Sequence, residues 1–203
     1  MNKLAANIPT LPNTPAPLVA AAAKKPPYIS WEQFQRRYLK KEDKYKYEWV
    51  RGTVQKTLRD MNQSQLTIWR FLKNHLAHLQ KNKNAGELVL EVDSFFAGAH
   101  RRPDLSYFSP EQILLWKNED QVPAFVIEII SNNDQLNNAH QKMEDYRQAG
   151  VSIVWHIFPK LRQVHVYKGK HMTICTDDDP CSAEPVIPGF FPTANAVFAE
   201  ATA

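Results

Sequence analysis

Cysteines, glycines and long apolar runs are all scarce in this sequence of 203 residues. Its two cysteines, Cys175 and Cys181, are too few for a disulfide framework or for a zinc site with four cysteine ligands. Its six glycines are scattered singly, which excludes a glycine-rich phosphate-binding loop. No window approaches the roughly 18 uninterrupted apolar residues of a transmembrane helix. We therefore expect a reduced, cytoplasmic protein that is not a membrane protein.

The excess of positive charge lies mainly at the start of the chain. Residues 1–27 carry three lysines and no acid, so they account for three of the four net charges. Net charge alone therefore does not indicate a nucleic-acid-binding domain, and a polyanion would need a local patch. The densest basic segment could follow a DNA backbone, although such a run is more often only a solvated surface. It contains Arg36, Arg37, Lys40, Lys41, Lys44 and Lys46.

The first 27 residues differ in composition from the rest. They contain six of the fourteen prolines and seven alanines. A secretory signal would place positive charge before its apolar run, whereas Lys24 and Lys25 follow the run at 18–23. This composition predicts a disordered tail over 1–27 and a folded domain over 28–203.

Strand patterns and helix patterns alternate along that domain. Residues 45–50 and 53–58 alternate on either side of Arg51-Gly52, which predicts a hairpin. Residues 125–130 and 153–158 are apolar on both faces, as central strands are. Strands interleaved with helices predict an α/β domain in which these two strands share one mixed sheet with 104–108, flanked by helices.

Three further segments complete the expected elements. The spacing of Leu66, Trp69, Leu72, Leu76 and Leu79 predicts a long amphipathic helix that buries this stripe. A second helix is expected over 137–149, with Met143 and Tyr146 facing inward and Gly150 ending it. Residues 87–96 alternate throughout and predict a single strand.

Three charged residues suggest chemistry. Glu128 interrupts an apolar central strand, where a carboxylate is costly unless a cation or hydrogen bonds compensate it. Asp104 follows Pro103 at the start of another strand, and Lys142 lies near the inward edge of the 137–149 helix. Each also has an ordinary explanation: a Glu paired with an arginine, a loop Asp, and a surface lysine.

Taken together, the three residues favour a catalytic interpretation. Two strand-borne carboxylates can hold a hard divalent cation through their oxygens. A nearby ammonium can orient a water or stabilise phosphoryl charge. This combination suits phosphodiester hydrolysis, because a bound metal polarises the phosphoryl group and lowers the pKa of the attacking water. We therefore expect Asp104, Glu128 and Lys142 to meet in one cleft.

The order of several short motifs resembles the Uma-type putative restriction endonuclease family, within the PD-(D/E)xK nuclease superfamily. The resemblance covers about residues 29–175. It rests on Tyr47–Gly52 (YEWVRG), Arg102–Ser106 (RPDLS), Val126–Ser131 (VIEIIS), Lys142–Val151 (KMEDYRQAGV) and Val154-Trp155. The resemblance implies a restriction-endonuclease-like fold and a metal-dependent endonuclease that hydrolyses DNA.

The resemblance also implies roles for individual residues. Asp104 and Glu128 match the two acids of the motif and would bind Mg²⁺ or Mn²⁺, with the backbone carbonyl of Ile129 as a further ligand. Lys142 matches a lysine that has moved to the following helix, and Glu48 matches a further carboxylate of the site. DNA is the implied partner, with RNA not excluded. A homodimer is expected because cutting both strands benefits from two sites.

Two positions depart from the family pattern. Gln65 stands where a His is frequent, and Phe158 stands where an Asp is frequent. Neither belongs to the implied metal set. They leave open the alternative of a non-catalytic nucleic-acid-binding or assembly module on the same fold, since a fold does not determine a function.

Overall fold

A computed structural model describes residues 27–59, 63–79, 86–96, 98–116, 120–131 and 133–199. The predicted tail, apart from residue 27, lies outside these residues, so the predicted division at residue 28 stays a prediction. Among the described residues, no helix is long and apolar enough to cross a membrane.

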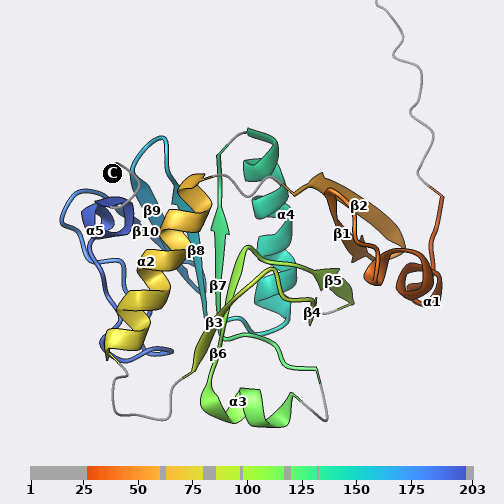
Figure 1. The fold of residues 1–203 in the computed structure, drawn as a ribbon, viewed down its shortest axis with the longest axis horizontal. Helices are drawn as coiled ribbons and strands as arrows, with labels where there is room; N and C mark the ends of the chain where they lie inside the picture. Colours follow the sequence, from red (N-terminus) through yellow and green to blue (C-terminus); the bar gives the residue numbers. More distant parts are fainter. Residues whose placement is uncertain are drawn as a thin grey trace, which may run out of the picture.

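A six-stranded mixed sheet forms the centre of the molecule (Figure 1). Its strand order is β10-β9-β8-β7-β6-β3, and only β7 and β8 pair in parallel. The three predicted core strands do lie in this one sheet. Its members are β3 (Glu87–Leu90), β6 (Leu105–Phe108), β7 (Phe125–Ile129), β8 (Ile153–Phe158), β9 (Gln163–Lys168) and β10 (His171–Cys175).

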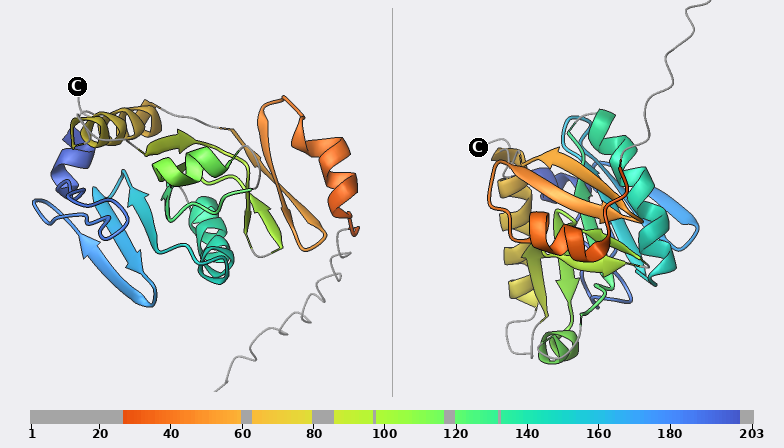
Figure 2. Two further views of the ribbon diagram at one scale, coloured as in Figure 1. Left: turned by 90° about the horizontal axis from the view of Figure 1, so that it is seen from below. Right: turned by 90° about the vertical axis from the view of Figure 1, so that its right-hand side faces the viewer.

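Helices cover both faces of the large sheet, as expected (Figure 2). On one face α2 (Gln63–Leu79) and α5 (Ala194–Ala199) share a core with Phe125 and Trp155. On the other face α4 (Asn133–Gln148) packs through Met143 and Tyr146 onto Val126. The short α3 (Pro110–Leu115) follows β6, with a capping box at Ser109.

The predicted apolar stripe of α2 needs correction at its ends. The buried residues are Ile68, Leu72 and Leu76, whereas Leu66 and Leu79 are exposed. At 3.6 residues per turn, Ile68 lies about 40° from Leu72 around the helix axis, but Leu66 lies about 120° away. The sheet therefore contacts a narrower stripe, with Ile68 in place of Leu66.

A smaller four-stranded sheet, in the order β2-β1-β5-β4, holds the N-terminal part of the domain. It consists of β1 (Tyr45–Val50), β2 (Thr53–Leu58), β4 (Ser94–Phe96) and β5 (Ala99–Arg101), and β1 and β2 form the predicted hairpin. The preceding α1 (Trp31–Phe34), capped by Ser30, continues as a π-helical segment over Gln35–Leu39.

The single strand predicted over 87–96 is wrong. Glu91 has a φ of 42°, a left-handed conformation that turns the chain between β3 and β4. The first half of the segment therefore joins the large sheet and the second half joins the small one. This turn brings the small sheet, with β1, to the edge of the site described next.

Candidate active site

The two faces of β1 carry different kinds of side chain: one face is aromatic and the other is charged. Tyr47 and Trp49 point into an aromatic core with Phe34 from α1. Since side chains alternate along a strand, Lys46 and Glu48 point the other way, toward the large sheet, and both are buried. The hairpin thus places one cation, Lys46, and one carboxylate, Glu48, between the two sheets.

Glu128 lies on the α4 face of β7, two positions after the core residue Val126. Its oxygens accept hydrogen bonds from Lys142 Nζ at 3.1 and 3.2 Å, and from the hydroxyl of Tyr146. Lys142 and Tyr146 are four residues apart on α4, so they share one helix face. The compensation that a buried strand carboxylate requires comes from this face, not from an arginine.

Glu48 approaches the same ammonium from the small sheet. Lys142 Nζ lies 3.2 Å from Glu48 Oε1, which also accepts the backbone N–H of Arg102 at 2.8 Å. The second oxygen, Oε2, accepts from Arg101 Nη1 at 3.2 Å. Lys142 therefore bridges two buried carboxylates, one from each sheet.

Asp104 stands just before β6, after Pro103. Its Oδ2 accepts the backbone N–H of Ile129 at 2.8 Å, and its Oδ1 lies 3.0 Å from Lys46 Nζ. The Asp104 side chain is 19% exposed, against 7% for Glu128. Asp104 is therefore the more accessible of the two carboxylates that sequence analysis assigned to a metal.

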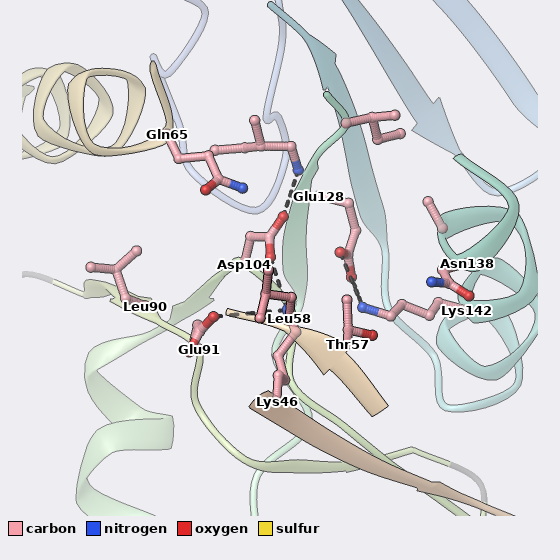
Figure 3. Close-up of a pocket in the computed structure, with 13 residues that line it drawn as sticks. Lys46, Thr57, Leu58, Gln65, Leu90, Glu91, Asp104, Glu128, Asn138 and Lys142 are labelled. Atoms are coloured by element: carbon pink, nitrogen blue, oxygen red, sulfur yellow. Dashed lines mark hydrogen bonds and ion pairs between the residues drawn. The ribbon is translucent and has the colours of Figure 1, made fainter. Parts of the chain in front are cut away.

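One pocket collects most of the predicted residues (Figure 3). Asp104, Glu128, Ile129 and Lys142 all line it, while Glu48 is absent from its lining and contacts Lys142 from outside the pocket. The full lining is Lys46, Thr57, Leu58, Gln65, Leu90, Glu91, Asp104, Glu128, Ile129, Ile130, Asn138, Ala139 and Lys142.

The two carboxylates that share Lys142 differ in the direction in which the fold shifts their pKa. Burial alone would raise the pKa of Glu48, but Lys142, Lys46 and Arg101 outweigh it and lower that pKa to about 2. Burial raises the pKa of Glu128; Lys142 opposes this rise, and Asp104 adds to it. Glu48 is thus held as an anion, and Glu128 is the member of the pair that takes a proton more readily.

Two residues of this site were not predicted from the sequence. Lys46 belongs to the densest basic segment, yet its side chain is buried and lines the pocket. Tyr146 was expected only to face inward, yet its hydroxyl also donates a hydrogen bond to Glu128. The alternation of β1 was the available signal for Lys46, because residues 46 and 48 must share a face.

The pocket offers hard oxygen donors for a divalent cation. In the part of the chain that the structure describes, no group of three or more His, Cys, Asp or Glu side chains is placed to hold a metal. Magnesium, however, keeps several waters and commonly takes only one or two carboxylates. The carbonyl of Ile129 lies on the same edge of β7 as its N–H, which points at Asp104. Asp104, Glu128 and this carbonyl are therefore oxygen donors of the kind that Mg²⁺ binds.

Comparisons with known proteins bear on the family and the fold of the chain. No curated protein matches the chain. Among solved structures, a crystal structure of "a putative nuclease belonging to DUF820" from Anabaena variabilis matches with a TM-score of 0.70 and 17% identity, covering 84% of this chain and 98% of that one. At this identity the match establishes the restriction-endonuclease-like fold. The model of the family described as "Uma2: Putative restriction endonuclease" matches residues 31–195, and the chain therefore belongs to the Uma2 family of restriction-endonuclease-like nucleases.

Proposed function

We propose that this protein is a Mg²⁺-dependent endonuclease that hydrolyses phosphodiester bonds of DNA, with Mn²⁺ as an alternative ion. The observation that carries the proposal is the shared pocket. Asp104, just before β6, Glu128 and Ile129 on β7, and Lys142 on α4 line the same opening. Metal-binding carboxylates beside a lysine suit the negative charge of a phosphodiester and its transition state.

Each residue has a distinct task in this proposal. Asp104 and Glu128 would hold the metal, together with the carbonyl of Ile129. When bound, the metal would polarise the phosphoryl group and lower the pKa of the attacking water. Lys142 remains close to the reacting phosphate because Glu48 holds its ammonium from outside the pocket, 3.2 Å away. From there it can donate a hydrogen bond to a phosphate oxygen or to the attacking water.

Tyr146 and Glu48 act as positioning residues. Burial raises the pKa of Tyr146 well above its usual value, so the phenol keeps its proton and its O–H donates a hydrogen bond to Glu128. Glu48, whose pKa is lowered, stays ionised and keeps Lys142 oriented. The contact from Tyr146 fixes the rotamer of Glu128, and the contact from Glu48 fixes that of Lys142. A precise catalytic geometry requires both side chains to be held in this way.

The test is a cleavage assay on supercoiled plasmid with Mg²⁺, Mn²⁺ or EDTA. We expect nicking or linearisation only with metal, and a loss of at least about 10²-fold in Glu128→Gln. The matched control is Glu144→Gln, an exposed carboxylate on α4 that accepts a hydrogen bond from Gln148 one helix turn further on. It should keep full activity.

The same assay separates the remaining candidates. Single-stranded and duplex RNA run in parallel decide between DNA and RNA as substrate. Metal-independent binding without cleavage of any nucleic acid would instead support a non-catalytic binding module. Cleavage that scales with the square of protein concentration at low concentration would support the proposed homodimer.

A further inference from the structure

Lys46 is a second cation that lines the pocket; it rises from β1 beside Asp104, whereas Lys142 enters from α4 beside Glu128 (Figure 3). Its ammonium lies 3.0 Å from Asp104 Oδ1 and 4.0 Å from Glu91 Oε1. Only 9% of its side chain is exposed. Burial lowers the pKa of Lys46, but Asp104, Glu48, Glu128 and Glu91 outweigh this and raise it, so Lys46 remains charged.

The Lys46 ammonium is paired with Asp104, the carboxylate that a metal would need as a ligand. One oxygen of Asp104 accepts the Ile129 N–H, and the other is paired with Lys46. A divalent ion bound to Asp104 would meet a positive charge at hydrogen-bond distance from the same carboxylate. In a partly buried site such repulsion is weakly screened. The ion and the ammonium therefore compete for Asp104.

Lys142 competes less strongly with a metal ion for its carboxylate, Glu128. It has a second partner, Glu48, at 3.2 Å, and can stay there while Glu128 turns to a metal. The corresponding second partner of Lys46 is Glu91, which is 4.0 Å away and is also approached by Arg59 Nε at 3.8 Å. Glu91 lines the pocket as well. A small rotation of the lysine side chain would exchange Asp104 for Glu91.

We propose, building on the metal-dependent function above, that Lys46 is an internal counter-cation that competes with the divalent ion for Asp104 and moves onto Glu91 when the ion binds. Lys46 thus neutralises Asp104 before the metal arrives and sets the metal affinity of the site. Glu91 favours loading because it receives the displaced ammonium. Neither residue is a metal ligand in this scheme.

The test measures metal binding without any nucleic acid. The full chain is titrated with Mn²⁺ and the free ion is followed by electron paramagnetic resonance. Lys46→Met should bind Mn²⁺ roughly tenfold more tightly, on the scale of coupling between neighbouring charges. Glu91→Gln should bind it several-fold more weakly, because the ammonium loses its alternative partner. Lys44→Met is the matched control: it removes the same charge two positions earlier from an exposed side chain and should bind as wild type.

A double variant separates this scheme from a direct role of Glu91 as a ligand. In the Lys46→Met background, Glu91→Gln should have no further effect. If it weakens binding there as much as in wild type, Glu91 is a ligand and the proposal is wrong. Equal affinity in wild type and Lys46→Met would also overturn it, while leaving the metal-dependent function intact.

Two further outcomes are equally decisive. If Asp104→Asn and wild type bind Mn²⁺ equally or not at all, and Lys46→Met adds no site, both the proposed function and this inference fail. Binding that appears only in Lys46→Met would support the competition directly. Circular dichroism checks the fold of each variant, and Lys46→Gln, which keeps a polar side chain, replaces Lys46→Met if the latter does not fold.

Discussion

Two clusters of buried charge meet at Glu48 and differ mainly in their access to solvent. The first, which we call the open cluster, consists of Asp104, Glu128, Lys46 and Lys142 and lines the pocket. The second, the sealed cluster, joins Arg101 to Asp145 through hydrogen bonds of 2.9 and 2.7 Å, and both side chains are almost fully buried. None of its residues lines the pocket. The same residue types thus serve a candidate reaction where a substrate can reach them and hold the fold together where none can.

The sealed cluster connects the small sheet to α4. Arg101 on β5 bonds Asp145 on α4, and also Glu48 on β1 and Gln55 on β2. It therefore fixes the distance between the sheet that carries Glu48 and the helix that carries Lys142. The open cluster depends on this connection for its geometry, and the comparison can be tested by breaking each cluster separately.

The largest loss of stability is expected from Arg101→Met. The variant leaves Asp145 without its main buried partner and removes one of the cations at Glu48, and breaking such a buried pair costs about 3–5 kcal/mol. Urea unfolding followed by circular dichroism measures the loss. In Arg101→Met/Asp145→Leu the remaining buried charge is removed as well, so we expect at least half of the stability to return. A double variant as unstable as the single one would contradict the assignment of this cluster to the fold.

The second largest effect is the contribution of Glu48 to the loss of stability at acidic pH. Its pKa in the folded protein is about 2, below the ordinary value of 4.5. Between these values the unfolded chain binds more protons than the folded one, so the free energy of unfolding falls as the pH drops from 4.5 to 2. We expect Glu48 to account for about 3 kcal/mol of this loss. Urea titrations at several pH values should give a flatter profile for Glu48→Gln, and identical slopes would refute the prediction.

The open cluster was partly predictable from the sequence because its acids violate local patterns. Glu128 interrupts an apolar strand, so it had to have a partner in the fold. The inward position of Lys142 on the next helix led to the expectation that the two residues share one cleft, but their direct ion pair was not predicted. The role of Lys46 could not be read in the same way. Six basic residues lie between 36 and 46, and the contact that distinguishes Lys46 is with Asp104, 58 positions away.

The junction of the two sheets was unpredictable for a different reason. The turn at Glu91 depends on a left-handed conformation at a residue that is not glycine, and no local signal marks it. The alternation over 87–96 continues through the turn, since period-2 patterning reports burial on each side and not the path of the backbone. Tertiary pairing with β5 and β6 decides where the strand ends.

Glu128→Gln should change the free energy of unfolding only slightly, and in the opposite direction to Arg101→Met. Burial raises the pKa of Glu128 in the folded protein, so the folded state binds more protons than the unfolded state and stability falls as the pH rises through this window. Lys142 keeps Glu48 as a partner when Glu128 is replaced. At pH 7 the glutamine variant should therefore be as stable as wild type or more stable, by about 1 kcal/mol at most. The difference should vanish in acid below the ordinary glutamate pKa. A loss above about 2 kcal/mol at pH 7 would instead give Glu128 a structural role.

Arg51→Ala should have the smallest effect, although it removes a direct partner of the sealed cluster. Arg51 Nη2 lies 2.7 Å from Asp145 Oδ1, but the arginine side chain is 52% exposed. Water can replace it at that oxygen, while Arg101 keeps the other one. The backbone conformation is left-handed at residue 51, with a φ of 46°, and both Arg and Ala carry a Cβ, so the substitution isolates the side chain. We expect a cost of about 0.5–1 kcal/mol that shrinks in high salt, measured by urea unfolding against Arg147→Ala as an exposed control on α4. A loss close to that of Arg101→Met would mean that access to solvent does not separate the two partners of Asp145.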